Sequence, residues 1–153
     1  MYVNLPFSVT HEVRDACVCM HLQRTARAVA RLFDDAFRPI GINNGQFSIL
    51  MSLNRPDPPR ISDVARLLDM DRTTLTAAIK VLERKGLMKA QADPGDRRTR
   101  RLTLTEAGKA ILVQAVPVWR ETLSKLGAPD TRSDLVADLA ALATRPDDHA
   151  DDA

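Results

Sequence analysis

Apolar residues recur every three or four positions along most of the chain, which is the spacing of helices that bury one face. The first such stretch predicts a long helix over Val18–Ile40, and Gly41 directly after it fits a C-terminal cap. Asn43 or Asn44 can cap a second helix, which ends near the proline-rich stretch 55–59. The chain is therefore predicted to begin with a long helix and a shorter one joined by a tight turn.

Two short helices are predicted next, in close succession. Ser62 is a good N-cap for the first, which ends at Asp69–Met70, and Asp71 caps the second, which ends at Gly86. The inward face of the second helix carries Leu75, Ile79 and Leu82. Its other face projects short, polar and basic side chains, namely Arg72, Thr73, Thr76, Ala77 and Lys80.

The helical spacing is then interrupted by a predicted β-hairpin. Leu87–Ala92 and Arg101–Leu104 form its arms, and the Asp/Pro/Gly-rich segment 93–96 is typical of a turn. Thr105 caps a fifth helix, and Thr131 opens a sixth whose apolar residues again share one face. The sequence thus predicts six helices and one hairpin.

A length of 153 residues suffices for one domain, and residues 146–153 are expected to be a disordered polar tail. Two cysteines cannot form a disulfide scaffold, and no signal peptide is visible, which favours a cytoplasmic location. No apolar run approaches the roughly 20 residues that cross a bilayer, so no membrane partner is expected. No phosphate-binding or dinucleotide-binding glycine pattern is present, so no cofactor is expected.

The formal net charge is only +2, which by itself argues against a polyanionic partner. This average conceals opposed regions. The segment Arg72–Arg101 contains nine basic and three acidic residues, a net charge of +6, whereas the last ten residues carry −3. The basic segment coincides with the polar helix face and the hairpin.

Two short helices joined by a tight turn and followed by a basic hairpin are the order of elements in a winged helix-turn-helix. Arg72 can donate to guanine O6 and N7, Ala77 permits close approach to DNA, and Lys80 can reach a phosphate. Arginines cluster at the hairpin, where a guanidinium at the tip can enter a narrow minor groove: Arg97, Arg98, Arg100 and Arg101. Double-stranded DNA is the predicted partner.

The same segments resemble a known family. Ile61–Leu87, Asp93–Arg98 and Leu104–Gly108 are similar to the MarR (multiple antibiotic resistance regulator) family of bacterial winged-helix transcription factors. The specific part is Asp-Arg-Arg in the wing followed by Leu-Thr-x-x-Gly. The resemblance covers roughly residues 13–142.

This resemblance implies a mainly α fold with a small β-hairpin wing, in one domain over 1–153. The winged helix-turn-helix lobe is expected at 43–104, flanked by dimerisation helices at 12–40 and 105–145. It further implies a homodimer on a pseudo-palindromic operator, most simply a repressor that a small, often aromatic, molecule releases from DNA.

Carried over residue by residue, the family's DNA contacts fall on Ser62, Arg72, Thr73, Thr74, Thr76, Ala77, Lys80, Arg97 and Arg98. Asp96 either orients a wing arginine or simply forms the turn. An effector pocket is expected between the first, second and fifth helices, with Leu22, Phe47, Met51 and Trp119 as candidates.

Two cysteines leave alternatives open. Cys17 and Cys19 stand at the start of the first helix, where the hydroperoxide-sensing branch of the family keeps a reactive cysteine. Residues two apart on a helix point roughly 200° apart, so oxidation would give a sulfenic acid or a bond across the dimer. Cys17 and His21, one turn apart, with His11, are candidate zinc ligands, although a closed site needs four. A small thiol enzyme is a further alternative, but it lacks an orienting third group.

Overall fold

The computed structural model describes residues 5–93, 95–96, 99–127 and 129–143. The elements in chain order are α1 (Phe7–Ala16), α2 (Val18–Phe37), the 3-10 helix η1 (Arg38–Ile40), α3 (Asn44–Ser52), α4 (Ile61–Leu67), α5 (Arg72–Arg84), β1 (Met88–Ala92), β2 (Arg100–Leu104), α6 (Glu106–Ser124) and α7 (Pro129–Ala143). The two strands pair antiparallel from Met88 opposite Leu104 to Ala92 opposite Arg100. The predicted fold class, mainly helical with a hairpin wing, is confirmed.

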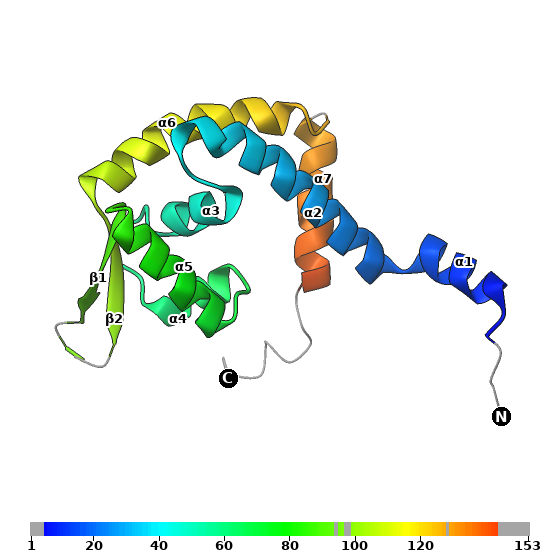
Figure 1. Cartoon of the computed structure of the whole chain (residues 1–153), viewed down its shortest axis with the longest axis horizontal. Coiled ribbons are helices and arrows are strands. Elements are labelled where there is room, and N and C mark those ends of the chain that lie inside the picture. The colour runs from blue at the N-terminus through cyan, green and yellow to red at the C-terminus, as the bar shows by residue number, and fades with distance from the viewer. Residues whose placement is uncertain (1–4, 94, 97–98, 128, 144–153) are drawn as a thin grey trace.

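Two groups of elements make up the molecule. Figure 1 shows α2 and α6 crossing above α3, α4 and α5, with the hairpin at one end and α7 descending from the end of α6. Helices α2 and α6 contact each other, and α3 contacts both of them. Helix α1 extends outward from α2 and has no buried residue. The helix-turn-helix and wing therefore form a lobe beneath the two long helices.

The core joins this lobe to the long helices. The Phe37 ring on α2 lies 4.8 Å, centroid to centroid, from the Phe47 ring on α3. The largest fully buried side chains come from α2 and from nearly every part of the lobe: Phe37, Ile49, Leu50, Leu75, Leu82, Met88, Leu102 and Val64. Since α5 and β2 contribute to this cluster, the same burial fixes the positions of α5 and of the hairpin.

Three predicted helix caps are confirmed. Asn43 and Gln46 form a reciprocal capping box at α3, in which the Asn43 side chain accepts from the Gln46 N–H. Asp71 accepts from the Thr74 N–H at 2.8 Å, and Thr105 accepts from the Gly108 N–H at 3.0 Å. Each of these caps depends only on residues within three positions, so sequence suffices to identify it.

The expected cap at Ser62 is wrong. Helix α4 already begins at Ile61, so Arg60 occupies the cap position and Ser62 lies exposed in the first turn. The Asp63 carboxylate accepts from the Arg60 N–H at 2.9 Å and satisfies this end of the helix instead.

Several boundaries also differ from expectation. The long first helix ends at Phe37 and tightens into η1, where Pro39 supplies no N–H for an α-helical bond; Gly41 then takes φ +79°, as its predicted capping role requires. Helix α1 was not expected, because its side chains are exposed and leave no buried stripe in the sequence. Helix α7 begins at Pro129, two residues before the expected Thr131. The predicted tail, 146–153, lies outside the described residues.

Candidate nucleic-acid interface and adjoining cavity

Helices α4 and α5 form a helix-turn-helix whose second helix has one buried and one exposed face. Leu75, Ile79 and Leu82 of α5 are buried in the core, as predicted. The turn between the helices includes Asp69 at φ +46°, and the Met70 N–H donates to the Ala65 carbonyl at 2.9 Å. The opposite face of α5 is exposed over Arg72, Thr73, Thr74, Ala77 and Lys80, with Thr76 half-buried.

Local hydrogen bonds occupy two of the α5 threonines. The Thr76 hydroxyl donates to the Arg72 carbonyl at 2.7 Å. Hydrogen bonds from Thr74, through its hydroxyl and its backbone N–H, lower the pKa of Asp71 below its ordinary value. The Arg72 guanidinium, by contrast, has no partner within the described part of the chain. Among the α5 side chains predicted to contact DNA, Arg72, Thr73 and Lys80 are therefore the most free to reach a ligand.

The wing follows α5 in the chain, and its first strand contacts that helix. Asp96 accepts from the Thr99 hydroxyl at 2.7 Å, a contact within the turn. Its predicted role toward a wing arginine stays a prediction, because Arg97 and Arg98 lie outside the described residues. Arg100, at the start of β2, is exposed and donates from Nη2 to the Ala90 carbonyl at 2.6 Å. In the described part of the wing, Arg100 of β2 therefore places an exposed positive charge next to the predicted hairpin tip.

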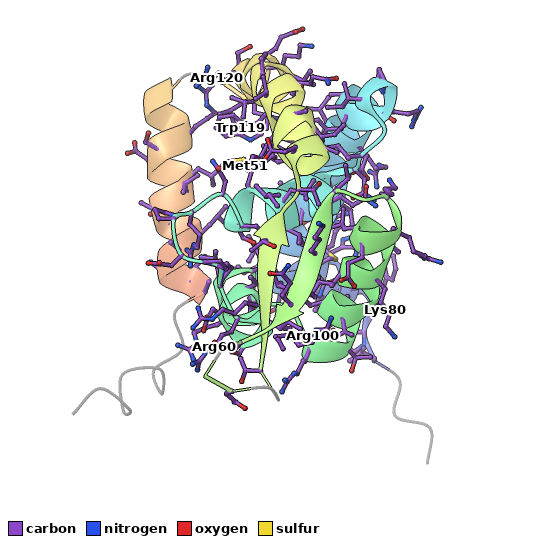
Figure 2. The ribbon with its side chains drawn as sticks, turned by 90° about the vertical axis from the view of Figure 1, so that its left-hand side faces the viewer. Met51, Arg60, Lys80, Arg100, Trp119 and Arg120 are labelled. Atoms are coloured by element: carbon purple, nitrogen blue, oxygen red, sulfur yellow. The ribbon has the colours of Figure 1, made fainter. Side chains whose placement is uncertain are left out.

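A further cation was missed by the sequence reasoning. Arg60 is exposed at the start of α4, and its backbone forms a β-bridge with Arg101 of the wing. Figure 2 shows Arg60, Lys80 and Arg100 at the same end of the molecule, although they come from three different elements. The only sequence signal was a basic residue directly before a helix, which is too common to be informative.

A cavity of about 680 Å³ opens between α3, the end of α4 and α6. Its lining is mostly apolar: Phe47, Ser48, Met51, Ser52, Leu67, Leu68, Val116, Trp119 and Arg120. Three predicted pocket residues, Phe47, Met51 and Trp119, are thus brought together, but the walls belong to the second, third and fifth predicted helices. Leu22 of the first helix does not line it.

Arg120 is the ionic group of this cavity and was also missed from sequence. It is exposed, and its guanidinium has no hydrogen-bond or ion-pair partner among the described residues. Figure 2 shows Arg120, Trp119 and Met51 near one another, at the end of the molecule opposite Arg60 and Lys80. The arrangement is that of an apolar, aromatic-walled site with one available cation.

Leu22 instead lines a second, apolar groove of about 630 Å³ between α2, the end of α6 and α7. Several of its side chains are exposed in the single chain, including Val18, Leu22, Leu135, Val136 and Leu139. Apolar residues spaced along one face of a helix predict that this face is covered by another element. The position of Leu22 shows that the spacing does not identify that element.

The two cysteines are free thiols at the start of α2. Cys17 is the N-cap residue, half-buried, and its Sγ accepts from the Met20 N–H at 3.5 Å. Cys19 is exposed, with Gln23 Nε2 at 3.4 Å from its Sγ. Within the described residues no group of three His, Cys, Asp or Glu side chains is placed to hold a metal ion, so the zinc hypothesis gains no support.

A helix-turn-helix with an exposed, basic second helix, followed directly by a two-stranded wing, defines a winged helix-turn-helix DNA-binding protein. The MarR family profile matches residues 42–99. The chain is 30% identical to the transcriptional repressor NicR of Pseudomonas putida over 120 residues, covering 77% of this chain and 72% of NicR. It belongs to the MarR family of DNA-binding transcriptional regulators, which are not enzymes.

Solved structures agree. The Mycobacterium tuberculosis regulator MosR in complex with DNA is 35% identical, with a TM-score of 0.72 over 83% of this chain and 96% of MosR. The repressor CouR bound to a 23-mer DNA duplex is 27% identical, with a TM-score of 0.76 over 92% of this chain and 99% of CouR. No helix in the described ranges is long and apolar enough to cross a membrane.

Proposed function

We propose that this protein is a repressor that leaves its operator when a small aromatic acid binds between α3, α4 and α6. The observation that carries the proposal is the Arg120 guanidinium, which has no partner among the described residues, at a mostly apolar cavity walled by Trp119. Apolar walls bury an aromatic ring, and a guanidinium binds a carboxylate with two parallel hydrogen bonds. NicR and CouR are named as repressors.

The position of the cavity supports a regulatory role. Its walls combine α6 with the DNA-binding lobe, and Leu67 and Leu68 lie directly before the turn into α5. A ligand that fits one spacing of α4 against α6 better than another shifts the population toward that spacing. Since α5 follows α4 after a short turn, such a shift moves the recognition helix.

On the operator, we infer contacts from Ser62, Arg72, Thr73, Thr74, Thr76, Ala77, Lys80, Arg97 and Arg98, joined by Arg60 and Arg100. The exposed apolar groove between α2, α6 and α7 supports a homodimer formed by these helices. A two-fold dimer presents two recognition helices, which match a pseudo-palindromic operator.

Substituting Arg120 with glutamine tests the effector proposal. We expect benzoate and 4-hydroxybenzoate to release the wild-type protein from DNA, and R120Q to need about tenfold or more of the same ligand, because a charge-assisted hydrogen bond is removed. Release is measured by fluorescence anisotropy on a duplex enriched from a random-sequence library with the wild-type protein.

The neutral isostere benzamide and the variant R31Q serve as controls, since Arg31 is exposed on α2 outside the cavity lining. Equal responses of R120Q and R31Q to benzoate, or release by benzamide as effective as by benzoate, would refute carboxylate recognition by Arg120. Family membership and DNA binding would stand in either case.

The position of Cys17 favours a second candidate, thiol-based sensing. The Cys17 side chain caps the start of α2, where its Sγ accepts from the Met20 N–H at 3.5 Å. A hydroperoxide would oxidise the Cys17 thiol to a sulfenic acid and be reduced to an alcohol. We expect cumene hydroperoxide to release C19S from DNA but not C17S; unchanged release of C17S would exclude Cys17 as the sensor.

A further inference from the structure

One arginine of the basic hairpin is directed into the protein. Arg101 of β2 donates from Nε to Asp93 Oδ2 and from Nη1 to the Pro58 carbonyl at 2.8 Å. Its neighbour in the strand, Leu102, donates its N–H to the Pro59 carbonyl at 2.9 Å. The loop between α3 and α4 is thereby joined to β2 through both a backbone bond and the Arg101 side chain.

The acceptor, Asp93, begins the turn at the wing tip. Its side chain is only 8% exposed, and its other oxygen, Oδ1, accepts from the Gly95 N–H at 2.8 Å. The Asp93 backbone is bonded to the far arm, because its N–H donates to the Thr99 carbonyl at 2.9 Å. The Gly95 N–H and the Arg101 guanidinium lower the pKa of this carboxyl, so it is ionised at neutral pH. One carboxylate thus connects the turn, the strand and the loop.

We propose that Arg101 is a positioning residue for DNA binding, and that the Asp93–Arg101–Pro58 junction sets the angle of the wing against the helix-turn-helix. The Arg101 side chain is 34% exposed and uses two donors within the protein. A two-stranded hairpin is marginally stable alone, so its orientation depends on what its base is attached to. The arginines predicted to contact DNA lie between Asp93 and Arg101 in the chain.

The direction in which one substitution changes DNA affinity distinguishes a positioning role from a purely electrostatic one. Replacing Asp93 with asparagine removes a negative charge from the most basic part of the chain. If Asp93 acted only as a charge, D93N would strengthen binding to the phosphate backbone. If the junction positions the wing, D93N weakens binding although the protein becomes more positive.

We expect D93N to bind the enriched duplex about tenfold more weakly than wild type, as removal of a charge-assisted pair implies. The matched control is D57N, which makes the same charge change one residue from Pro58, at an exposed carboxylate. D57N is expected to bind as well as wild type or slightly better. Hydrogen exchange should rise in the peptide 88–104 of free D93N but not over α5. Binding of D93N equal to that of D57N, or unchanged exchange in the wing, would overturn the proposal.

Two further variants distinguish an effect on wing position from simple unfolding of the protein. R101K keeps the charge but cannot supply both fixed donors, so it should also weaken binding while melting as wild type does. In D93N/R101Q, the reduction in affinity should be smaller than the sum of the two single reductions, since both act through one junction. Wild-type affinity in R101K, or additive reductions in the double variant, would show that Arg101 does not act through Asp93.

Discussion

Alanine at position 108 is expected to destabilise the fold, although glycine to alanine inside a helix normally stabilises it. A Cβ built on Gly108 would lie 1.9 Å from the Leu87 carbonyl oxygen and 3.0 Å from its carbonyl carbon. Both are backbone atoms, held between α5 and β1, so the new methyl group cannot be accommodated by a side-chain rotation. We expect the free energy of unfolding to fall by about 3 kcal/mol, the upper part of the range for overpacking.

Hydrogen bonds hold the start of α6 against the segment between α5 and β1, next to Gly108. The Thr105 hydroxyl donates to the Gly86 carbonyl at 2.6 Å, and the Thr105 N–H donates to the Leu87 carbonyl at 3.2 Å. The start of α6 is thereby bonded to the end of the recognition helix. Moving α6 away to make room for a methyl group would break these bonds, which is why the cost is expected to be large.

Chemical denaturation of G108A measures this cost, with G45A as the control. Gly45 lies in the first turn of α3, and a Cβ there meets only Asn43 Oδ1 at 3.6 Å, an ordinary contact. G45A should be neutral or more stable by up to about 1 kcal/mol, in line with helix propensity. Wild-type stability in G108A would show that α6 does not approach the Leu87 carbonyl this closely.

Local sequence signals account for most of the fold and for part of the site. Asn43, Asp71 and Thr105 were identifiable as caps because each bonds a backbone group three residues away. The roles of Arg101 and Arg120 were not predictable in this way, because they depend on residues far along the chain. Arg101 bonds the Pro58 carbonyl, and Arg120 shares its cavity with residues of α3 and α4. Sequence spacing predicts which face of a helix is buried but not what lies opposite that face.

The charge of the DNA-binding segment shows the same limit. Counting residues gives +6 over 72–101, but Lys85 donates to the Gly41 carbonyl and to Gln46 Oε1, at 2.9 and 3.0 Å. Arg101 is likewise bonded within the protein. These two cations hold elements together, so fewer basic side chains are available to contact DNA than the nine in the count. Arg60, outside the counted segment, adds one exposed cation.

The largest effect on DNA binding is expected from the double variant R72A/K80A. Arg72 stands at the N-terminal end of α5, is exposed and has no partner in the described residues, as a side chain that reads a base edge in the major groove should be. One bidentate arginine–guanine contact contributes about 1–3 kcal/mol of discrimination. In the proposed dimer each substitution occurs twice, so we expect affinity for the enriched duplex to fall by about 100-fold or more.

The two removed side chains should leave different signatures in anisotropy titrations at several salt concentrations. Without Lys80, the slope of log affinity against log salt should become shallower by about 0.9 for each phosphate that is no longer neutralised. R72A alone should leave this slope nearly unchanged and reduce the preference for the enriched duplex over an unrelated one. The control R24A/K125A removes the same charge from exposed positions on α2 and after α6. If it weakened binding as much as R72A/K80A, the net charge of the protein, and not the exposed face of α5, would be responsible for DNA recognition.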